Sequence, residues 1–263
     1  MITNTDKVKH FWQSRAQDNV SESELTHRDI WQRWLEIEMI KGFLKKSDRV
    51  IDVGCGNGYT SKIIASLAHE IVGIDYSEDM IKRAVVSDEV LGEETHSENI
   101  IFAVCNVMEL TTAKFGLFDV AISERCLINL GSWDDQKQAI ANIAAVIKPE
   151  GRFLFIEGSQ FGRNQLNQFR KSVGLEEMPP VWHNIDFNDS DLLNYLNGYF
   201  VLEHRLHFGV YDFISRILHP LIVEPEQPRY DSKINKIAAM MALKRQEFED
   251  ISRVLFWVLR KKC

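Results

Sequence analysis

Between residues 49 and 158, short apolar runs alternate with stretches whose apolar side chains recur every three or four positions. The apolar runs lie at 50–53, 71–74, 100–104, 118–122 and 153–156. The runs have the length of buried strands, and the stretches between them have the period of helices. Strands that alternate with helices at this spacing predict parallel β-α-β units. We therefore expect a doubly wound α/β sheet with helices on both faces.

Beyond Gly158 the alternation loosens. One more strand is expected at 199–208. A last strand is expected at 253–260, where apolar, β-branched and aromatic residues follow one another without gaps. The stretches at about 160–197 and 210–250 have mostly helical patterns, so we expect them to be insertions that cap the sheet.

The first 48 residues are also predicted to be helical. Ile30, Trp31, Trp34 and Ile37 recur at helical spacing and form one apolar stripe, which is typical of core packing. The expected organisation is therefore an N-terminal helical segment at 1–48, followed by an α/β domain at 49–263 that carries the two insertions.

Composition narrows the class of protein. The chain has 263 residues, 45% of them hydrophobic, and a formal charge of −7. This length can bury a core without disulfides or metal. A net negative charge is not typical of a nucleic-acid-binding protein, and it gives no attraction to anionic membranes. We expect a cytoplasmic protein without membrane insertion or a metal site, because the N-terminus is polar, no apolar run can span a bilayer and no two cysteines are spaced C-x-x-C.

A glycine loop follows the first strand. Gly54, Gly56 and Gly58 stand in a G-x-G-x-G pattern between a strand and a helix, where backbone N–H groups can approach a ligand closely. A dinucleotide-binding fold would place its third glycine at Tyr59. The acid Asp52 would repel a pyrophosphate but suits a ligand that carries an ammonium and a sulfonium. The loop therefore favours a cation-bearing ligand.

A second acid, Asp75, closes the second strand. A carboxylate at this position can accept hydrogen bonds from both hydroxyls of a ribose, as in dinucleotide-binding folds. An acid at a strand end can also cap a helix or simply be solvated. Its combination with the glycine loop favours the ribose.

Residues 49–157 resemble the core of the class I S-adenosylmethionine-dependent methyltransferases. Four stretches carry the resemblance, in the family's order: Val50-Ile51-Asp52-Val53-Gly54-Cys55-Gly56-Asn57-Gly58, Gly73-Ile74-Asp75-Tyr76-Ser77, Phe118-Asp119-Val120-Ala121-Ile122 and Ile147-Lys148-Pro149-Glu150-Gly151. The resemblance implies a Rossmann-like sheet of seven strands, mostly parallel with an antiparallel last strand. It also implies that the segment 1–48 covers the site of the cofactor, S-adenosylmethionine.

The resemblance also assigns cofactor-binding residues. The three loop glycines would line the methionine end, Asp75 would hold the ribose, and Met80 would lie against the adenine. Where the family has an acid for the adenine amino group, this chain has Asn106, whose amide oxygen can accept the same bond. Val107 and Met108 would flank the ring. The expected cofactor set is Asp52, Gly54, Cys55, Gly56, Gly58, Asp75, Tyr76, Met80, Asn106, Val107, Met108 and Ser123.

The acceptor side is expected beyond the carboxyl ends of the strands, in the segment after the fourth strand and in the insertions. His183 is the candidate general base, because a histidine titrates near neutrality. For Glu124 and Arg125, which follow the fourth strand, the alternative is an ion pair between the two that shapes the loop. The substrate candidates are Glu124, Arg125, Asn184, His207, Tyr211 and Arg216.

The sequence thus predicts methyl transfer to an oxygen or nitrogen of a small-molecule acceptor, such as a sugar, lipid or secondary-metabolite intermediate. Three alternatives stay open at this point. The first is an NAD(P)-dependent oxidoreductase, which the residues Tyr59 and Asp52 disfavour. The second is a non-catalytic protein that binds S-adenosylmethionine. The third is another use of the cofactor, such as aminopropyl transfer.

Overall fold

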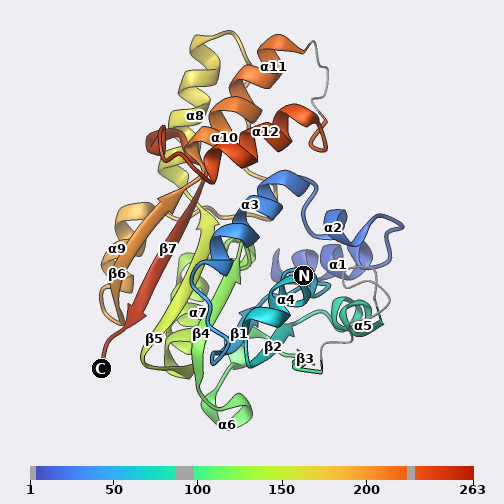
Figure 1. Ribbon diagram of the computed structural model, residues 1–263, viewed down its shortest axis with the longest axis vertical. Helices are drawn as coiled ribbons and strands as arrows, with labels where there is room; N and C mark the ends of the chain where they lie inside the picture. The colour runs from blue at the N-terminus through green and yellow to red at the C-terminus, as the bar shows by residue number, and fades with distance from the viewer. Residues whose placement is uncertain (1–3, 87–97, 224–228) are drawn as a thin grey trace.

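Seven strands form one sheet in the computed structural model, which describes residues 4–86, 98–223 and 229–263 (Figure 1). Their order is β3-β2-β1-β4-β5-β7-β6. The strands from β3 to β5 pair in parallel, whereas β7 pairs antiparallel with both β5 and β6. The bounds are β1 Arg49–Val53, β2 Glu70–Asp75, β3 Ile100–Val104, β4 Phe118–Glu124, β5 Ile147–Gly158, β6 Phe200–His207 and β7 Val254–Lys261. The predicted fold class, including the antiparallel last strand, is confirmed.

The central strands are apolar because both of their faces are covered. In β1, the residues from Val50 to Val53 are all buried, and β7 is buried from Val254 to Leu259. Strands of this kind read as continuous apolar runs rather than alternating ones. The sheet therefore forms the middle layer of the molecule.

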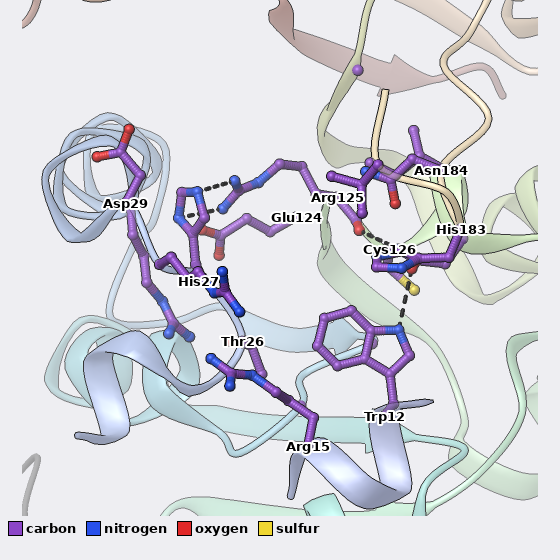
Figure 2. Close-up of a pocket in the computed structure, with 18 of the residues that line it drawn as sticks. Trp12, Arg15, Thr26, His27, Asp29, Glu124, Arg125, Cys126, His183 and Asn184 are labelled. Atoms are coloured by element: carbon purple, nitrogen blue, oxygen red, sulfur yellow. Dashed lines mark hydrogen bonds between the residues drawn. The ribbon is translucent and has the colours of Figure 1, made fainter. Parts of the chain in front are cut away.

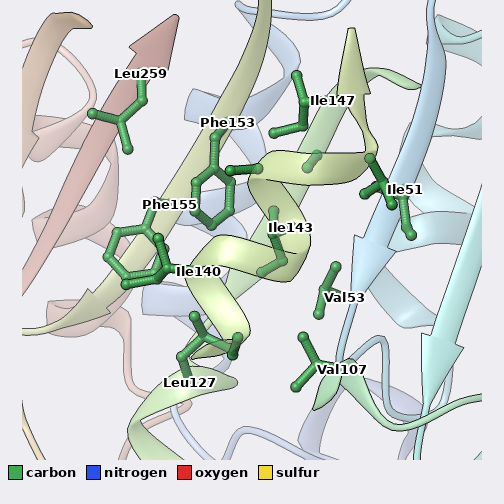
Figure 3. Close-up of a cluster of buried hydrophobic side chains, with 14 of the residues drawn as sticks. Ile51, Val53, Val107, Leu127, Ile140, Ile143, Ile147, Phe153, Phe155 and Leu259 are labelled. Carbon is green, nitrogen blue, oxygen red and sulfur yellow. The ribbon is translucent and has the colours of Figure 1, made fainter. Parts of the chain in front are cut away.

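Helices cover the two faces. The packed helices are α4 Tyr59–Ile64, α5 Glu78–Val86, α7 Trp133–Val146 and α9 Asp189–Leu196. On one face, Ile140 and Ile143 of α7 pack with Phe153 and Phe155 of β5 (Figure 3). Ser132 caps the start of α7, because its hydroxyl oxygen accepts a hydrogen bond from the Asp135 N–H at 3.1 Å.

The other face is covered by helices from the two ends of the chain. The N-terminal helices are α1 Asn4–Arg15, α2 Glu22–Leu25 and α3 Ile30–Lys41. In α3, Leu35, Ile37 and Ile40 are buried in the same cluster as Ala238 and Ala239 of the C-terminal half. Between residues 4 and 41 the N-terminal segment is therefore mostly helical, as expected, and the apolar stripe of α3 is part of the core.

The insertions gather beyond one end of the sheet (Figure 1). They contain α8 Gln160–Ser172, α10 Gly209–Phe213, a π-helical turn at Ile214–Leu218, α11 His219–Ile222 and α12 Lys233–Ala242. One helix differs from expectation: α9 lies within 160–197 but packs its Leu192 and Leu196 into the core cluster of the sheet. It covers the sheet face, because its apolar residues meet α7 and β5 rather than the other insertion helices. In the described ranges, no helix has the length and apolar content to cross a membrane.

Candidate active site

The glycine loop after β1 bends through three left-handed residues. Gly54, Gly56 and Gly58 have φ angles of +74°, +55° and +71°, a region in which an L side chain is strained. A Cβ at Gly54 would collide with the Cys126 sulfur, and one at Gly56 would lie 2.8 Å from a Thr26 methyl carbon. Glycine is therefore required both by the backbone and by neighbours that pack directly against the loop.

The Asp75 carboxylate joins the loop to the end of β2. Its Oδ2 accepts a hydrogen bond from the Gly56 N–H at 3.0 Å, and its Oδ1 accepts one from the Ser77 N–H at 2.8 Å. Burial raises the pKa of Asp75 to about 6, against the effect of these two donors. Each oxygen keeps a further lone pair for a ligand.

Asp52 lies at the base of the same loop. It is 2% exposed and accepts a hydrogen bond from the Ser61 hydroxyl. Burial, together with the nearby Glu124 and Asp75, raises the pKa of Asp52 to about 7, against the lowering effect of the Ser61 hydrogen bond. A cationic group of a ligand would stabilise its charged form.

A cavity of about 920 Å³ opens above the loop. It is bounded by the loop, the ends of β2 and β4, the N-terminal segment and the turn before α9. The predicted residues that line it are Asp52, Gly54, Cys55, Gly56, Asp75, Tyr76, Met80, Glu124, Arg125, His183, Asn184 and Arg216. The structure thus brings most of the predicted cofactor and acceptor residues to one space.

Five predicted cofactor residues do not line the cavity. Gly58 begins α4 and packs against the Phe102 ring. The Asn106 amide oxygen accepts the Met108 N–H at 3.0 Å, and Val107 is buried in the core cluster against which Met108 packs. Ser123 is buried and donates to Glu157 Oε1 at 2.8 Å. In the turn after β3, the Asn106 side chain therefore caps its own turn and does not face the cavity.

Two substrate candidates also lie outside the cavity lining. The His207 ring accepts the Gly209 N–H at 3.3 Å at the end of β6. The Tyr211 hydroxyl donates to Asp29, whose carboxylate also pairs with Arg216. His207 and Tyr211 therefore hold local structure, and Tyr211 reaches the cavity only through Asp29.

Residues of the N-terminal segment form a large part of the wall, and the sequence analysis assigned none of them to the site. They are Phe11, Trp12, Arg15, Thr26, His27, Asp29 and Arg33. A signal was present in α3 and its cap, where Asp29, Arg33 and Glu36 recur at the spacing of one helix face. Charged residues on a buried face indicate a polar site.

The segment after β4 meets this wall. Figure 2 shows the Arg125 guanidinium directed at the His27 ring, with Nη2 2.7 Å from Nδ1. Burial and then Arg125 lower the pKa of His27 well below its usual value, so the ring is neutral and can accept from the guanidinium. Arg125 pairs with Glu36 at 3.0 Å, and Glu124 accepts from the Thr60 hydroxyl at 2.7 Å. The alternative of a Glu124–Arg125 ion pair is therefore not what the structure shows.

Glu157 of β5 fixes the backbone of this segment. It is 1% exposed, and its carboxylate accepts the N–H groups of Cys126, Leu127 and Ile128 at 3.1, 2.9 and 3.2 Å. Arg125, just before them, has a φ of 53°. A buried carboxylate thus holds a strained residue at the cavity.

His183 lies in an aromatic part of the wall. Its ring centroid is 4.7 Å from that of Phe11, 5.6 Å from Trp12 and 5.0 Å from Trp182. Burial lowers the pKa of His183, which keeps the ring neutral at neutral pH. Its Nδ1 and the Asn184 Oδ1 have no hydrogen-bond partner within the described part of the chain. Both atoms are acceptors available for a ligand.

A family model for a methyltransferase domain matches residues 44–185, more than half of the chain. YqeM of Bacillus subtilis (strain 168), named as a candidate methyltransferase, is 31% identical over 134 residues, which cover 51% of this chain and 49% of the relative. A ubiquinone biosynthesis O-methyltransferase of Coxiella burnetii (strain Dugway 5J108-111) is 32% identical over 135 residues, with 50% and 51% covered. The chain spans about half the length of these curated relatives.

Solved structures share the fold over nearly the whole chain. The N-methyltransferase NodS from Bradyrhizobium japonicum WM9, in complex with S-adenosyl-L-homocysteine, has a TM-score of 0.61 at 12% identity and covers 97% of this chain and 99% of its own. The magnesium protoporphyrin IX methyltransferase from Synechocystis PCC 6803, also with bound S-adenosylhomocysteine, has a TM-score of 0.56 at 14% identity, with 95% and 93% covered. This chain belongs to the class I S-adenosylmethionine-dependent methyltransferase family.

Proposed function

We propose that the chain binds S-adenosylmethionine in the 920 Å³ cavity and transfers its methyl group to an oxygen or nitrogen of a small-molecule acceptor. The observation that carries the proposal is the continuity of this cavity. It connects the glycine loop and Asp75, which suit the cofactor, with Glu124 and His183, which suit an acceptor.

The residues at the loop end fit the cofactor. The free lone pairs of Asp75 match the two ribose hydroxyls, and Asp52 can balance the methionine ammonium. Gly54 and Gly56 leave room for the backbone to approach the ligand, and Met80 offers an apolar contact for the adenine. When bound, the cofactor supplies an activated methyl group on a sulfonium. For the adenine amino group, Asn106 would have to release the Met108 N–H, so its role depends on a change of that cap.

The acceptor end suits a small molecule. The volume of the whole cavity lies in the range of ligand cavities, and the aromatic rings around His183 offer apolar contact with a few polar atoms. Neutral His183 can accept a hydrogen bond or a proton from an acceptor O–H or N–H. The O-methyltransferase and N-methyltransferase among the similar proteins support acceptors of either kind. A sugar, lipid or secondary-metabolite intermediate in the cytoplasm is the class we propose.

The N-terminal segment 1–48 is proposed to cover the cofactor. Asn57 in the glycine loop donates through Nδ2 to the Glu22 carbonyl oxygen at 2.9 Å and to its carboxylate at 2.6 Å. Thr26 packs against Gly56. The segment therefore excludes water from the methionine end, which favours transfer to the acceptor.

The test is methyl transfer from labelled S-adenosylmethionine to a fractionated small-molecule extract, followed by identification of the labelled product. We expect one labelled small molecule, and a rise in melting temperature with S-adenosylhomocysteine but not with NAD. Label found only on protein or nucleic acid would contradict the proposed acceptor class.

A further inference from the structure

A buried carboxyl group, Glu36 of α3, and a half-buried one, Glu124 of β4, lie side by side at the cavity wall. Glu36 is 0% exposed, and the carboxyl group of Glu124 is close enough to it to share a hydrogen bond and to raise its pKa. Glu36 Oε2 and Glu124 Oε1 receive no hydrogen bond from any N–H or O–H donor of the described residues. Ionised carboxylates only accept hydrogen bonds, so a bond between two of them requires a proton on one.

The groups around the pair favour a single shared proton. Gln32 donates to Glu36 Oε1 at 3.1 Å, and Arg125 Nη2 lies 3.0 Å from Glu36 Oε2. Burial raises the pKa of Glu36 to about 8, and Glu124 raises it while Arg125 opposes the shift. One negative charge per pair avoids two like charges side by side, which would repel each other away from bulk water.

The other neighbours of Glu124 leave it available at the cavity. The Thr60 hydroxyl donates a hydrogen bond to Glu124 Oε2 at 2.7 Å. The positive charge of Arg33 and the negative charge of Asp52 lie nearby. Arg33 is 5% exposed and has no carboxylate within 4.0 Å in the described residues, so its positive charge adds to that of Arg125. Of the two carboxyl groups, only Glu124 lines the cavity.

We propose that Glu36 and Glu124 share one proton and that Glu124 is the base that takes the acceptor's proton during methyl transfer. This inference rests on the proposed function. The acceptor's O–H or N–H bond breaks, and its proton passes to the Glu124 carboxylate. The acceptor's electron pair forms the bond to the methyl carbon, and the pair of the broken C–S bond stays on sulfur, which becomes the neutral thioether. Glu36 acts as a positioning residue, and His183 accepts a hydrogen bond from the acceptor.

The shared proton is tested without any acceptor. Carboxyl resonances of protein labelled with carboxyl-¹³C glutamate are followed with pH in the wild type, Glu36→Gln and Glu124→Gln, with Glu38→Gln as a control. Glu38 lies on the same helix and pairs with Lys41 outside the cavity. We expect one carboxyl to titrate near pH 8 in the wild type and in the control, and this titration to be lost in both other variants. Two independent titrations near pH 4–5 would overturn the proposal.

The catalytic role is tested with the product-forming extract fraction from the labelling experiment. Glu124→Gln should lower kcat by about 10²–10⁴-fold while S-adenosylhomocysteine still binds within about threefold of wild type. Glu36→Gln, which keeps a neutral hydrogen-bond donor beside Glu124, should stay within about tenfold. His183→Asn should mainly raise KM. Full kcat in Glu124→Gln, or an equal loss of cofactor binding, would overturn the role of Glu124 as base. An enzyme that binds no cofactor would instead refute the proposed function, whatever the titration shows.

Discussion

The glycines with positive φ differ in what surrounds them. At Gly54 the backbone is left-handed and a Cβ would meet the sulfur and Cβ of Cys126. At Gly174, after α8, φ is +83° but nothing lies within 4 Å of an added Cβ. Gly54 therefore combines backbone strain with crowding, whereas Gly174 has the backbone strain alone.

Replacing Gly54 with alanine should lower the free energy of unfolding by about 2–5 kcal/mol, since the backbone term of about 1–2 kcal/mol is joined by overpacking of about 1–3 kcal/mol. Gly174→Ala should cost only the backbone term. Urea unfolding of both variants measures the difference. Equal losses at the two sites would show that Cys126 does not constrain the loop.

The strand pattern explains why some of the cavity residues lie together and leaves others unexplained. Asp52 and Asp75 lie at the ends of β1 and β2, and Gly54 follows β1 directly, so the strand pattern alone places them at one edge of the sheet. Asp29 depends instead on Tyr211 and on residues as far as 187 positions away along the chain. No local sequence pattern predicts such a contact, because it depends on where the insertion at 210–250 packs in the folded protein.

At the scale of elements, Arg83 of α5 fastens the N-terminal segment. Its guanidinium donates to the Glu22 carboxylate at 2.7 Å and to the carbonyl oxygens of Ala16, Asp18 and Val20 at 3.0, 2.8 and 3.1 Å. The turn between α1 and α2 has few apolar contacts of its own, with a small cluster around Leu25 and Met80. The Arg83 side chain therefore fixes much of the chain between α1 and α2.

We expect Arg83→Ala to loosen the residues from Ala16 to Leu25 while leaving the sheet intact. Deuterium exchange of backbone amides should rise by about tenfold or more in this segment, because four bonds to a charged donor, each of about 1.5–3 kcal/mol, are lost. Lys82→Ala, beside it but exposed, is the matched control. Unchanged exchange in Arg83→Ala would mean that other contacts hold the segment.

The order of the elements could be predicted from the sequence, but some boundaries and placements could not. β5 begins at Ile147, where α7 ends, although the pattern predicted only 153–156. Lys148-Pro149-Glu150-Gly151 follows the end of α7 almost directly and belongs to this long strand, at the place where the pairing with β4 shifts its register. The position of α9 over the sheet likewise depends on tertiary packing of Leu192 and Leu196.

For the whole molecule, several buried carboxyl groups have a raised pKa. Burial raises the pKa of Glu36 to about 8, of Asp52 and Glu157 to about 7, and of Asp75 to about 6. In the unfolded chain these groups titrate near pH 4. These four groups therefore bind more protons in the folded protein than in the unfolded chain between about pH 4 and pH 8, and the stability they contribute falls as the pH rises through this window. His27 and His183, whose pKa is lowered by burial, act in the opposite direction and offset part of this fall.

The protein without ligand should accordingly unfold at a lower urea concentration at pH 8.5 than at pH 5.5, with a loss of at least about 2 kcal/mol. The contribution of Glu36 is complete below about pH 4 and is lost as the pH approaches 8. Glu36→Gln should make the dependence shallower, and Glu38→Gln should not. Stability that increases from pH 5.5 to pH 8.5 would contradict the buried, protonated state of these acids.

The central claim is that the cavity above the glycine loop binds the cofactor with Asp75 on the ribose. Calorimetric titration with S-adenosylhomocysteine tests it most directly in the wild type, Asp75→Asn and Asp79→Asn, the last being an acid of α5 that does not line the cavity. We predict one site per chain and affinity weakened about tenfold or more in Asp75→Asn, with Asp79→Asn unchanged. No binding at millimolar ligand, or equal affinity in all three proteins, would contradict it.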